Sequence, residues 1–178
     1  MSKIMNSLVP SVQYLVASLG VKVMTHTEYL ENPEYLGDSL EHPENWAAFY
    51  NPVLDVVVVN DTELANATEL VLHEIIHWSG AETRLNRQWV TSMKAAMLGD
   101  QSEELLEYLT DKRDTEEATA QIGMLKLALV LGLNPAQYAE STLTYLEDLL
   151  DFSLKKAEED SDKAVEYLVT RIGMQKVA

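Results

Sequence analysis

The chain has 178 residues, 47% of them hydrophobic and 24% charged, which is ordinary for a globular protein with a single domain over residues 1–178. Its 29 Asp and Glu against 13 Lys and Arg give a net charge of −16 and argue against nucleic-acid binding, which requires clustered cations. The absence of cysteine excludes disulfides and thiolate metal sites, and the N-terminus is too polar for a signal peptide or membrane span. We therefore expect a cytoplasmic protein.

The first third of the chain is predicted to mix helix, loop and strand. Apolar residues at helical spacing predict a helix over 4–19, which either starts or kinks at Pro10. The stretch 28–45 is rich in Pro, Asn and Glu and is typical of a loop. Residues 56–59 are four valines, which favour a strand at either the edge or the interior of a sheet. The expected strands are 21–24, 47–50 and 55–59.

Nearly everything after Thr62 is predicted to be helical. The expected helices are 67–79, 86–98, 102–110, 115–131, 135–151 and 153–173. Strands at the front and helices behind predict an α+β fold, with a small N-terminal antiparallel sheet packed on a predominantly helical domain.

One of these helices carries the pattern H-E-x-x-H. His73 and His77 lie four residues apart, so both imidazoles project from one face and can reach the same ion. Neutral imidazoles suit Zn²⁺, and Glu74 would lie beside the metal as the general base that takes a proton from water. Apolar residues occupy the opposite arc, and Gly80 is a natural stop. The alternative interpretation is that two histidines fell four apart by chance on an ordinary amphipathic helix.

A third zinc ligand is expected later in the chain. The longer metzincin pattern would need a histidine at position 83, which is Thr83, and no later histidine exists. A carboxylate on a following helix is therefore expected, as in His₂Glu sites. Glu117 is the favoured ligand because it shares a largely apolar helical stripe with Gln121, and Glu116 and Asp114 are the alternatives. Gln121 could hydrogen-bond a ligand imidazole from behind.

Three other side chains are candidates for substrate contacts. Arg84 and Arg87 could hold a substrate carboxylate, but arginines at such positions more often brace a turn through carboxylates or carbonyls, and we favour that role. Tyr108 could donate to an oxyanion, although its amphipathic surroundings favour ordinary packing.

Several blocks of the sequence, in the correct order, resemble the metallopeptidase domain of ArdC-type antirestriction proteins, a domain also found in phage and plasmid polyvalent proteins. The run HEIIHWSGAETRLNR beginning at His73 closely resembles the family pattern HELxHWTGxxxRLNR. Upstream, AFYNPVLDVV beginning at Ala48 is similar to the hairpin AYYxPxxDxI. Downstream, EEATAQIG beginning at Glu116 is similar to EELVAEIG. The resemblance covers about residues 45–170.

This resemblance implies a zincin-like fold with His73, His77 and Glu117 as zinc ligands and Glu74 as base. It also implies a phage or mobile-element origin and a function in the host cytoplasm. Two departures matter. Gln121 stands where the family has a second acid, which would weaken polarisation of a ligand histidine, and the single-stranded-DNA-binding domain of longer relatives is not expected.

The leading functional hypothesis is therefore a zinc metallopeptidase that hydrolyses a protein or peptide substrate, with a host protein as a candidate. The alternative is a non-catalytic or weakly catalytic acidic protein on the same scaffold that blocks a basic host protein. Binding to nucleic acid or to membranes is not expected.

Overall fold

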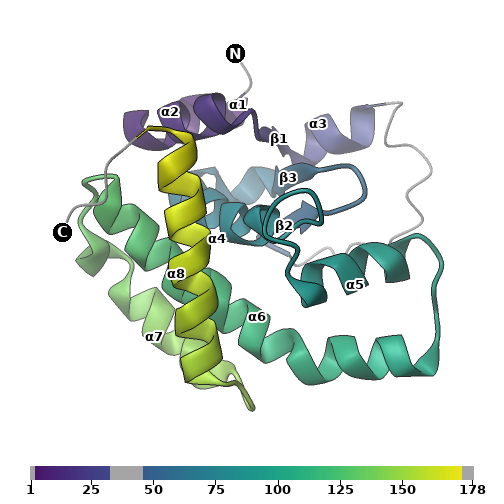
Figure 1. Ribbon diagram of the computed structural model, residues 1–178. Coiled ribbons are helices and arrows are strands. Elements are labelled where there is room, and N and C mark those ends of the chain that lie inside the picture. Colours follow the sequence, from purple (N-terminus) through teal and green to yellow (C-terminus); the bar gives the residue numbers. More distant parts are fainter. Residues whose placement is uncertain (1–2, 33–45, 174–178) are drawn as a thin grey trace.

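The computed structural model describes residues 3–32 and 46–173, and it has the α+β architecture expected from the sequence (Figure 1). Its three strands are β1 (Lys22–Thr25), β2 (Ala48–Asn51) and β3 (Val56–Val59). Its helices are α1 (Lys3–Ser7), α2 (Pro10–Leu19), α3 (His26–Glu31), α4 (Ala67–Ser79), α5 (Gln88–Met97), α6 (Glu103–Val130), α7 (Ala139–Asp148) and α8 (Leu154–Arg171), with 3₁₀ turns η1 (Asp61–Asn66) and η2 (Pro135–Gln137).

The sheet is mixed, whereas an antiparallel sheet was expected. Its order is β1-β3-β2: β2 pairs antiparallel with β3 as in a hairpin, but β1 runs parallel to β3. Parallel pairing is possible here because the connection from β1 to β3 is a long crossover that includes α3 and β2. The side chains of β3 are between 0% and 1% exposed, so β3 is the interior strand and β2 is an edge.

Three helical regions differ from the expected boundaries. The predicted helix 4–19 is two helices, because Pro10 begins α2. The predicted loop 28–45 was wrong over residues 28–31, where α3 is held by a capping box between Thr25 and Glu28, and its part from 33 to 45 lies outside the described residues. The predicted helix 135–151 is divided into η2 and α7.

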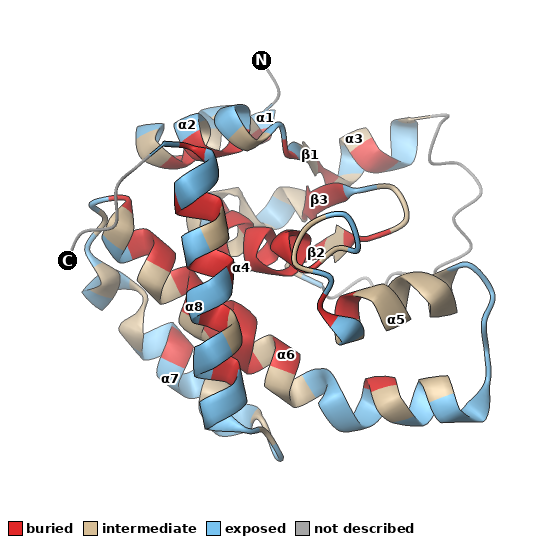
Figure 2. Cartoon of the chain, in the orientation of Figure 1, coloured by how far each residue is buried: buried red, intermediate tan, exposed pale blue. Residues whose placement is uncertain are grey.

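The predicted break between helices 102–110 and 115–131 was also wrong, since α6 is continuous over both. Residues 111–114 are polar and mostly exposed, but Asp, Lys and Arg are compatible with a helix, so a polar run alone does not end one. The exposed N-terminal half of α6 lies at the lower right in Figure 2, whereas its C-terminal half contributes buried side chains such as Met124 and Leu127.

The helix that carries H-E-x-x-H lies at the centre of the core. α4 contacts β2, β3, α6 and α8, and its Leu72, Ile75 and Ile76 are fully buried. None of the described helices combines the length and apolar character needed to span a bilayer.

Close packing of α6 on α4 depends on Gly123. A Cβ atom at this position would lie 3.0 Å from Cγ1 and Cδ1 of Ile76, tighter than ordinary van der Waals contact. Ile76 directly precedes His77, and Gly123 follows the acidic residues of α6 by two turns. The missing side chain therefore lets the two helices approach closely enough for their polar residues to meet.

Replacement of Gly123 by valine is expected to lower the free energy of unfolding by about 1–3 kcal/mol, because the branched side chain overpacks this contact. Urea denaturation measures the change. Adding Ile76→Ala to the valine variant should cost less than it does in the wild type, since the smaller residue makes room. Strictly additive losses of unfolding free energy in the double variant would contradict a direct contact between residues 123 and 76.

Candidate metal centre

α4 presents His73, Glu74 and His77 on the side of the helix that faces a cavity. The apolar arc predicted for this helix is buried, with Val71, Leu72, Ile75, Ile76 and Trp78 each at most 6% exposed. All three polar residues line the cavity. Burial of the apolar arc fixes the rotation of α4, so the direction of the polar side chains follows from the core packing.

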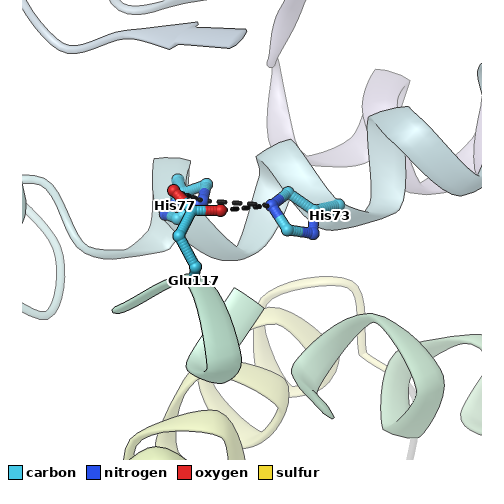
Figure 3. A group of neighbouring side chains, drawn as sticks. All are labelled: His73, His77 and Glu117. Atoms are coloured by element: carbon cyan, nitrogen blue, oxygen red, sulfur yellow. Dashed lines mark hydrogen bonds and ion pairs between the residues drawn. The ribbon is translucent and has the colours of Figure 1, made fainter. Parts of the chain in front are cut away.

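His73, His77 and Glu117 come together in the structure, with one donor atom from each within 4.8 Å of the others (Figure 3). The two Nε2 atoms are 3.2 Å apart, Glu117 Oε2 is 3.4 Å from His73 Nε2, and Glu117 Oε1 is 3.8 Å from His77 Nε2. Donors about 2.0–2.1 Å from a tetrahedral zinc ion lie roughly 3.4 Å from one another. Their spacing and chemistry therefore fit a His₂Glu site, and binding by these residues stays a prediction.

The outer nitrogen of each imidazole is held by a residue of α6. His73 Nδ1 lies 2.8 Å from Gln121 Oε1, and His77 Nδ1 lies 3.0 Å from Glu116 Oε1. Gln121 Nε2 donates to Thr142 Oγ1 at 3.0 Å, which fixes the amide with its oxygen toward His73. In their neutral forms both imidazoles would then carry their proton on Nδ1, which leaves both Nε2 lone pairs facing the cluster.

Neither alternative to Glu117 contributes a carboxylate oxygen to the group formed by His73, His77 and Glu117. Glu116 is 4% exposed and lies behind His77, where the Arg87 guanidinium donates to it from Nε and from Nη2 at 2.7 Å. Asp114 Oδ2 accepts the backbone N–H groups of Leu150 and Asp151 after α7. Two consecutive residues of α6 thus approach the two ring nitrogens of His77: Glu116 lies at Nδ1 and Glu117 at Nε2.

Arg84 and Arg87 both brace the structure, as favoured from the sequence. Besides Glu116, Arg87 binds the Ile76 carbonyl at the end of α4 through Nη2 at 2.6 Å. Arg84 stacks 3.8 Å from the Trp78 ring centroid and donates to Asp55 of the β2–β3 hairpin. The two arginines therefore tie α4 to α6 and to the sheet.

Burial and neighbouring charges act against each other throughout the cluster. Burial lowers the pKa of both imidazoles, but nearby carboxylates outweigh it, so the pKa of His73 is raised and that of His77 rises to about 10. Burial raises the pKa of Glu117, yet the two histidines hold it well below its usual value. Burial also raises the pKa of Glu74, and here it prevails over the histidines. A cation entering the metal-free site therefore has to displace a proton.

Tyr145 of α7 is the site residue that the sequence did not point to. Its hydroxyl donates to Glu117 Oε2 at 2.7 Å, and its ring centroid lies 5.9 Å from that of His73. Burial and the Glu117 charge raise its pKa, so it stays a proton donor. Tyr108, the tyrosine considered from sequence, does not line the cavity. Because Tyr145 and Glu117 are 28 residues apart in the sequence, no local sequence pattern predicts their contact.

Replacement of Tyr145 by phenylalanine is expected to weaken zinc binding by about 10- to 100-fold, because Glu117 loses the donor that orients it. Competition with a chromophoric chelator measures the affinity. Tyr138→Phe is the matched control, since Tyr138 is the N-cap residue of the same helix and its hydroxyl forms no hydrogen bond with His73, His77 or Glu117. Equal affinities in all three proteins would contradict the orienting role.

The cavity beside the cluster has a volume of about 660 Å³ and follows the outer edge of the sheet. Five consecutive residues, from Trp46 to Tyr50, line it. Since side chains alternate between the two faces of a strand, a cavity that touches the consecutive β2 residues Ala48, Phe49 and Tyr50 runs along the edge of β2. No strand of the described ranges, 3–32 and 46–173, pairs with that edge.

The sequence matches no protein-family model and no curated protein. Among solved structures, it is similar to the metal-free antirestriction ArdC protein from the R388 plasmid, at 22% identity and a TM-score of 0.52 over 94% of this chain and 53% of that one. The Mn(II)-bound ArdC structure gives 21% identity and a TM-score of 0.51 over 95% of this chain and 54% of that one. The chain thus spans about half the length of these neighbours, and the likeness shows the fold.

Proposed function

We propose that this ArdC-like fold is a divalent-metal-dependent peptidase, with His73, His77 and Glu117 as ligands and Glu74 as general base. The observation that carries the proposal is the convergence of these three donors beside a buried carboxylate at an open cavity. The two imidazoles and one carboxylate suit Zn²⁺. The Mn(II)-bound state of an ArdC neighbour supports a divalent cation at this fold.

A bound divalent cation would supply Lewis acidity, lowering the pKa of water towards about 7 and polarising a carbonyl group. The chain itself then has to move one proton. Glu74 Oε would accept it from the attacking water and pass it to the nitrogen of the leaving amine. Burial, which raises the pKa of Glu74, suits a carboxylate that must hold this proton briefly.

The edge of β2 supports an extended peptide as the substrate. An extended peptide that lies against a sheet edge binds through its main chain without regard to sequence. Because the cavity follows this edge as far as Tyr50 and also contains Glu74, a peptide lying there would pass the base. An ArdC neighbour is an antirestriction protein from a plasmid, which supports a mobile-element origin and a host protein as the target.

The test is metal-dependent cleavage of a mixed library of internally quenched peptides. The purified chain should cleave peptides when loaded with zinc, lose the activity on chelation and recover it when zinc is returned. Manganese in place of zinc tests which cation supports turnover. Absence of cleavage with either metal, in protein shown by elemental analysis to be loaded, would overturn the proposal.

The net charge of −16 favours a second candidate function, an acidic protein that blocks a basic host protein without catalysis. The two candidates differ in what they need from Glu74. A blocking protein should keep its biological effect when Glu74 is replaced by glutamine, since one charge of many is removed. A peptidase should lose it.

A further inference from the structure

The cavity beside the metal cluster has two unlike walls. On one side α5 contributes Trp89, Val90, Met93 and Met97, all of them apolar. Positions 89, 93 and 97 are four apart, so this wall is one continuous face of α5.

Other parts of the cavity are polar. Glu69 from α4, Arg113 from α6 and Ser141 from α7 line it, and Ser141 donates to Glu69 at 2.6 Å. A ligand that enters the cavity therefore meets apolar side chains from α5 and charged or hydroxyl groups from α4, α6 and α7. This division gives the cavity a means of selecting among side chains.

The α5 wall begins directly at the cluster. The Trp89 ring centroid is 6.2 Å from that of His77, with the planes inclined by 36°. Trp89 Nε1 donates to the Leu109 carbonyl of α6 at 3.0 Å, which fixes the indole against the neighbouring helix. A substrate side chain lying on this wall would therefore belong to a residue close to the peptide bond that the water activated by the metal and Glu74 would attack.

The wall suits large apolar side chains of more than one shape. Met93 and Met97 are half-buried, and the unbranched, polarisable methionine side chain adapts its rotamers to the group packed against it. The four residues of the wall include no cation that could pair with an acidic side chain, and the carboxylates that line the cavity, Glu69, Glu74 and Glu117, outnumber its arginine, Arg113. An aspartate placed on the wall would lose hydration without gaining a partner.

We infer that the α5 wall is the subsite that sets substrate specificity, and that it takes a large apolar side chain such as Leu, Met or Phe next to the scissile peptide bond. The inference rests on the proposed peptidase function. In an extended peptide alternate side chains point to opposite sides, so a chain along β2 would direct one residue near the reacting bond toward α5.

The experiment uses the zinc-loaded full chain and peptides that differ only at the residues flanking the bond that is cleaved. At the position that contacts α5, Leu, Met and Phe should each give a kcat/KM at least about 10-fold above Ala, because loss of even one methylene from an apolar pocket costs about that much. The kcat/KM of the peptide with Asp at this position should fall below that of the peptide with Ala. Binding of non-cleavable Leu and Asp isosteres, measured by calorimetry, should show the same order without depending on turnover.

Met93→Lys should reverse the order of kcat/KM between the Asp and Leu peptides, because the ammonium group of the introduced lysine pairs with the Asp side chain of the peptide. Ser92→Lys is the matched control: it adds the same charge to α5 at a residue that does not line the cavity, and should leave the preference unchanged. Should Met93→Lys fail to fold by circular dichroism, Met97→Lys places the charge one turn further along the same wall.

The outcomes separate this inference from the function on which it rests. Cleavage without preference for apolar residues, or an unchanged Leu-to-Asp ratio in the folded lysine variant, overturns the subsite while the peptidase function stands. Failure of the loaded protein to cleave any peptide overturns the function. Equal affinity for the two isosteres overturns the subsite in that case as well.

Discussion

Replacement of Glu117 by alanine should lower the affinity for zinc by at least about 100-fold. Residues that only orient a ligand already contribute 10- to 100-fold, so removal of a direct donor is expected to reach or exceed the upper end. Glu117 is the carboxylate whose oxygens lie 3.4 and 3.8 Å from the two histidine Nε2 atoms. Elemental analysis after dialysis and chelator competition measure the loss.

Asp114→Ala is the matched control for this result. Asp114 is an acid on the same helix and was an alternative ligand, but it accepts hydrogen bonds from the backbone after α7. Its removal should leave zinc affinity unchanged within about twofold and affect only stability, by about 1 kcal/mol. Full zinc retention in Glu117→Ala would show that the third donor comes from another residue.

The H-E-x-x-H helix could be predicted to its exact ends because its signals are local. The periodicity of Leu72, Ile75 and Ile76 predicts the buried face, and Gly80 follows its last residue. The capping box that starts α3 was a local signal too, but the six-residue helix precedes Asn32 and Pro33, whose turn propensity dominated the prediction. Short helices with strong caps are easily missed for this reason.

The surroundings of the ligands could be predicted only in part. Helical spacing placed Glu116 and Glu117 about 100° apart, but which of them faces the Nε2 atoms of the two histidines depends on how α6 packs on α4. That packing is set by Gly123 against Ile76 and by the Arg87–Glu116 pair, contacts between residues far apart in the sequence. Gln121 was placed behind a histidine from its position one turn after Glu117, and the structure puts it against His73.

Gln121 and Glu116 make the two imidazoles chemically unequal. His77 is backed by a carboxylate that Arg87 keeps charged, whereas His73 is backed by a neutral amide. A carboxylate raises the basicity of an imidazole ligand more than an amide does. The substitution of an amide for the acid in the ArdC-type pattern therefore affects His73 alone, whereas His77 is polarised by a carboxylate.

Replacement of Glu74 by glutamine should reduce kcat by about 100- to 10,000-fold, the usual contribution of a positioned general base. The amide is nearly isosteric but cannot accept the proton of the attacking water. Zinc affinity should remain close to that of the wild type, because Glu74 is not among the donors of the cluster. Steady-state hydrolysis of a quenched peptide and zinc analysis on the same preparation provide both measurements.

Glu69→Gln separates proton transfer from the general effect of removing a negative charge. Glu69 lies on the same helix and lines the same cavity, but its carboxylate is engaged by Ser141. Its replacement changes the electrostatic field of the cavity to a similar degree without touching the base, so kcat should change by less than about 10-fold. If Glu74→Gln and Glu69→Gln lose activity equally, the negative charge of Glu74 rather than proton transfer explains its role. Normal turnover by Glu74→Gln would exclude Glu74 as the base.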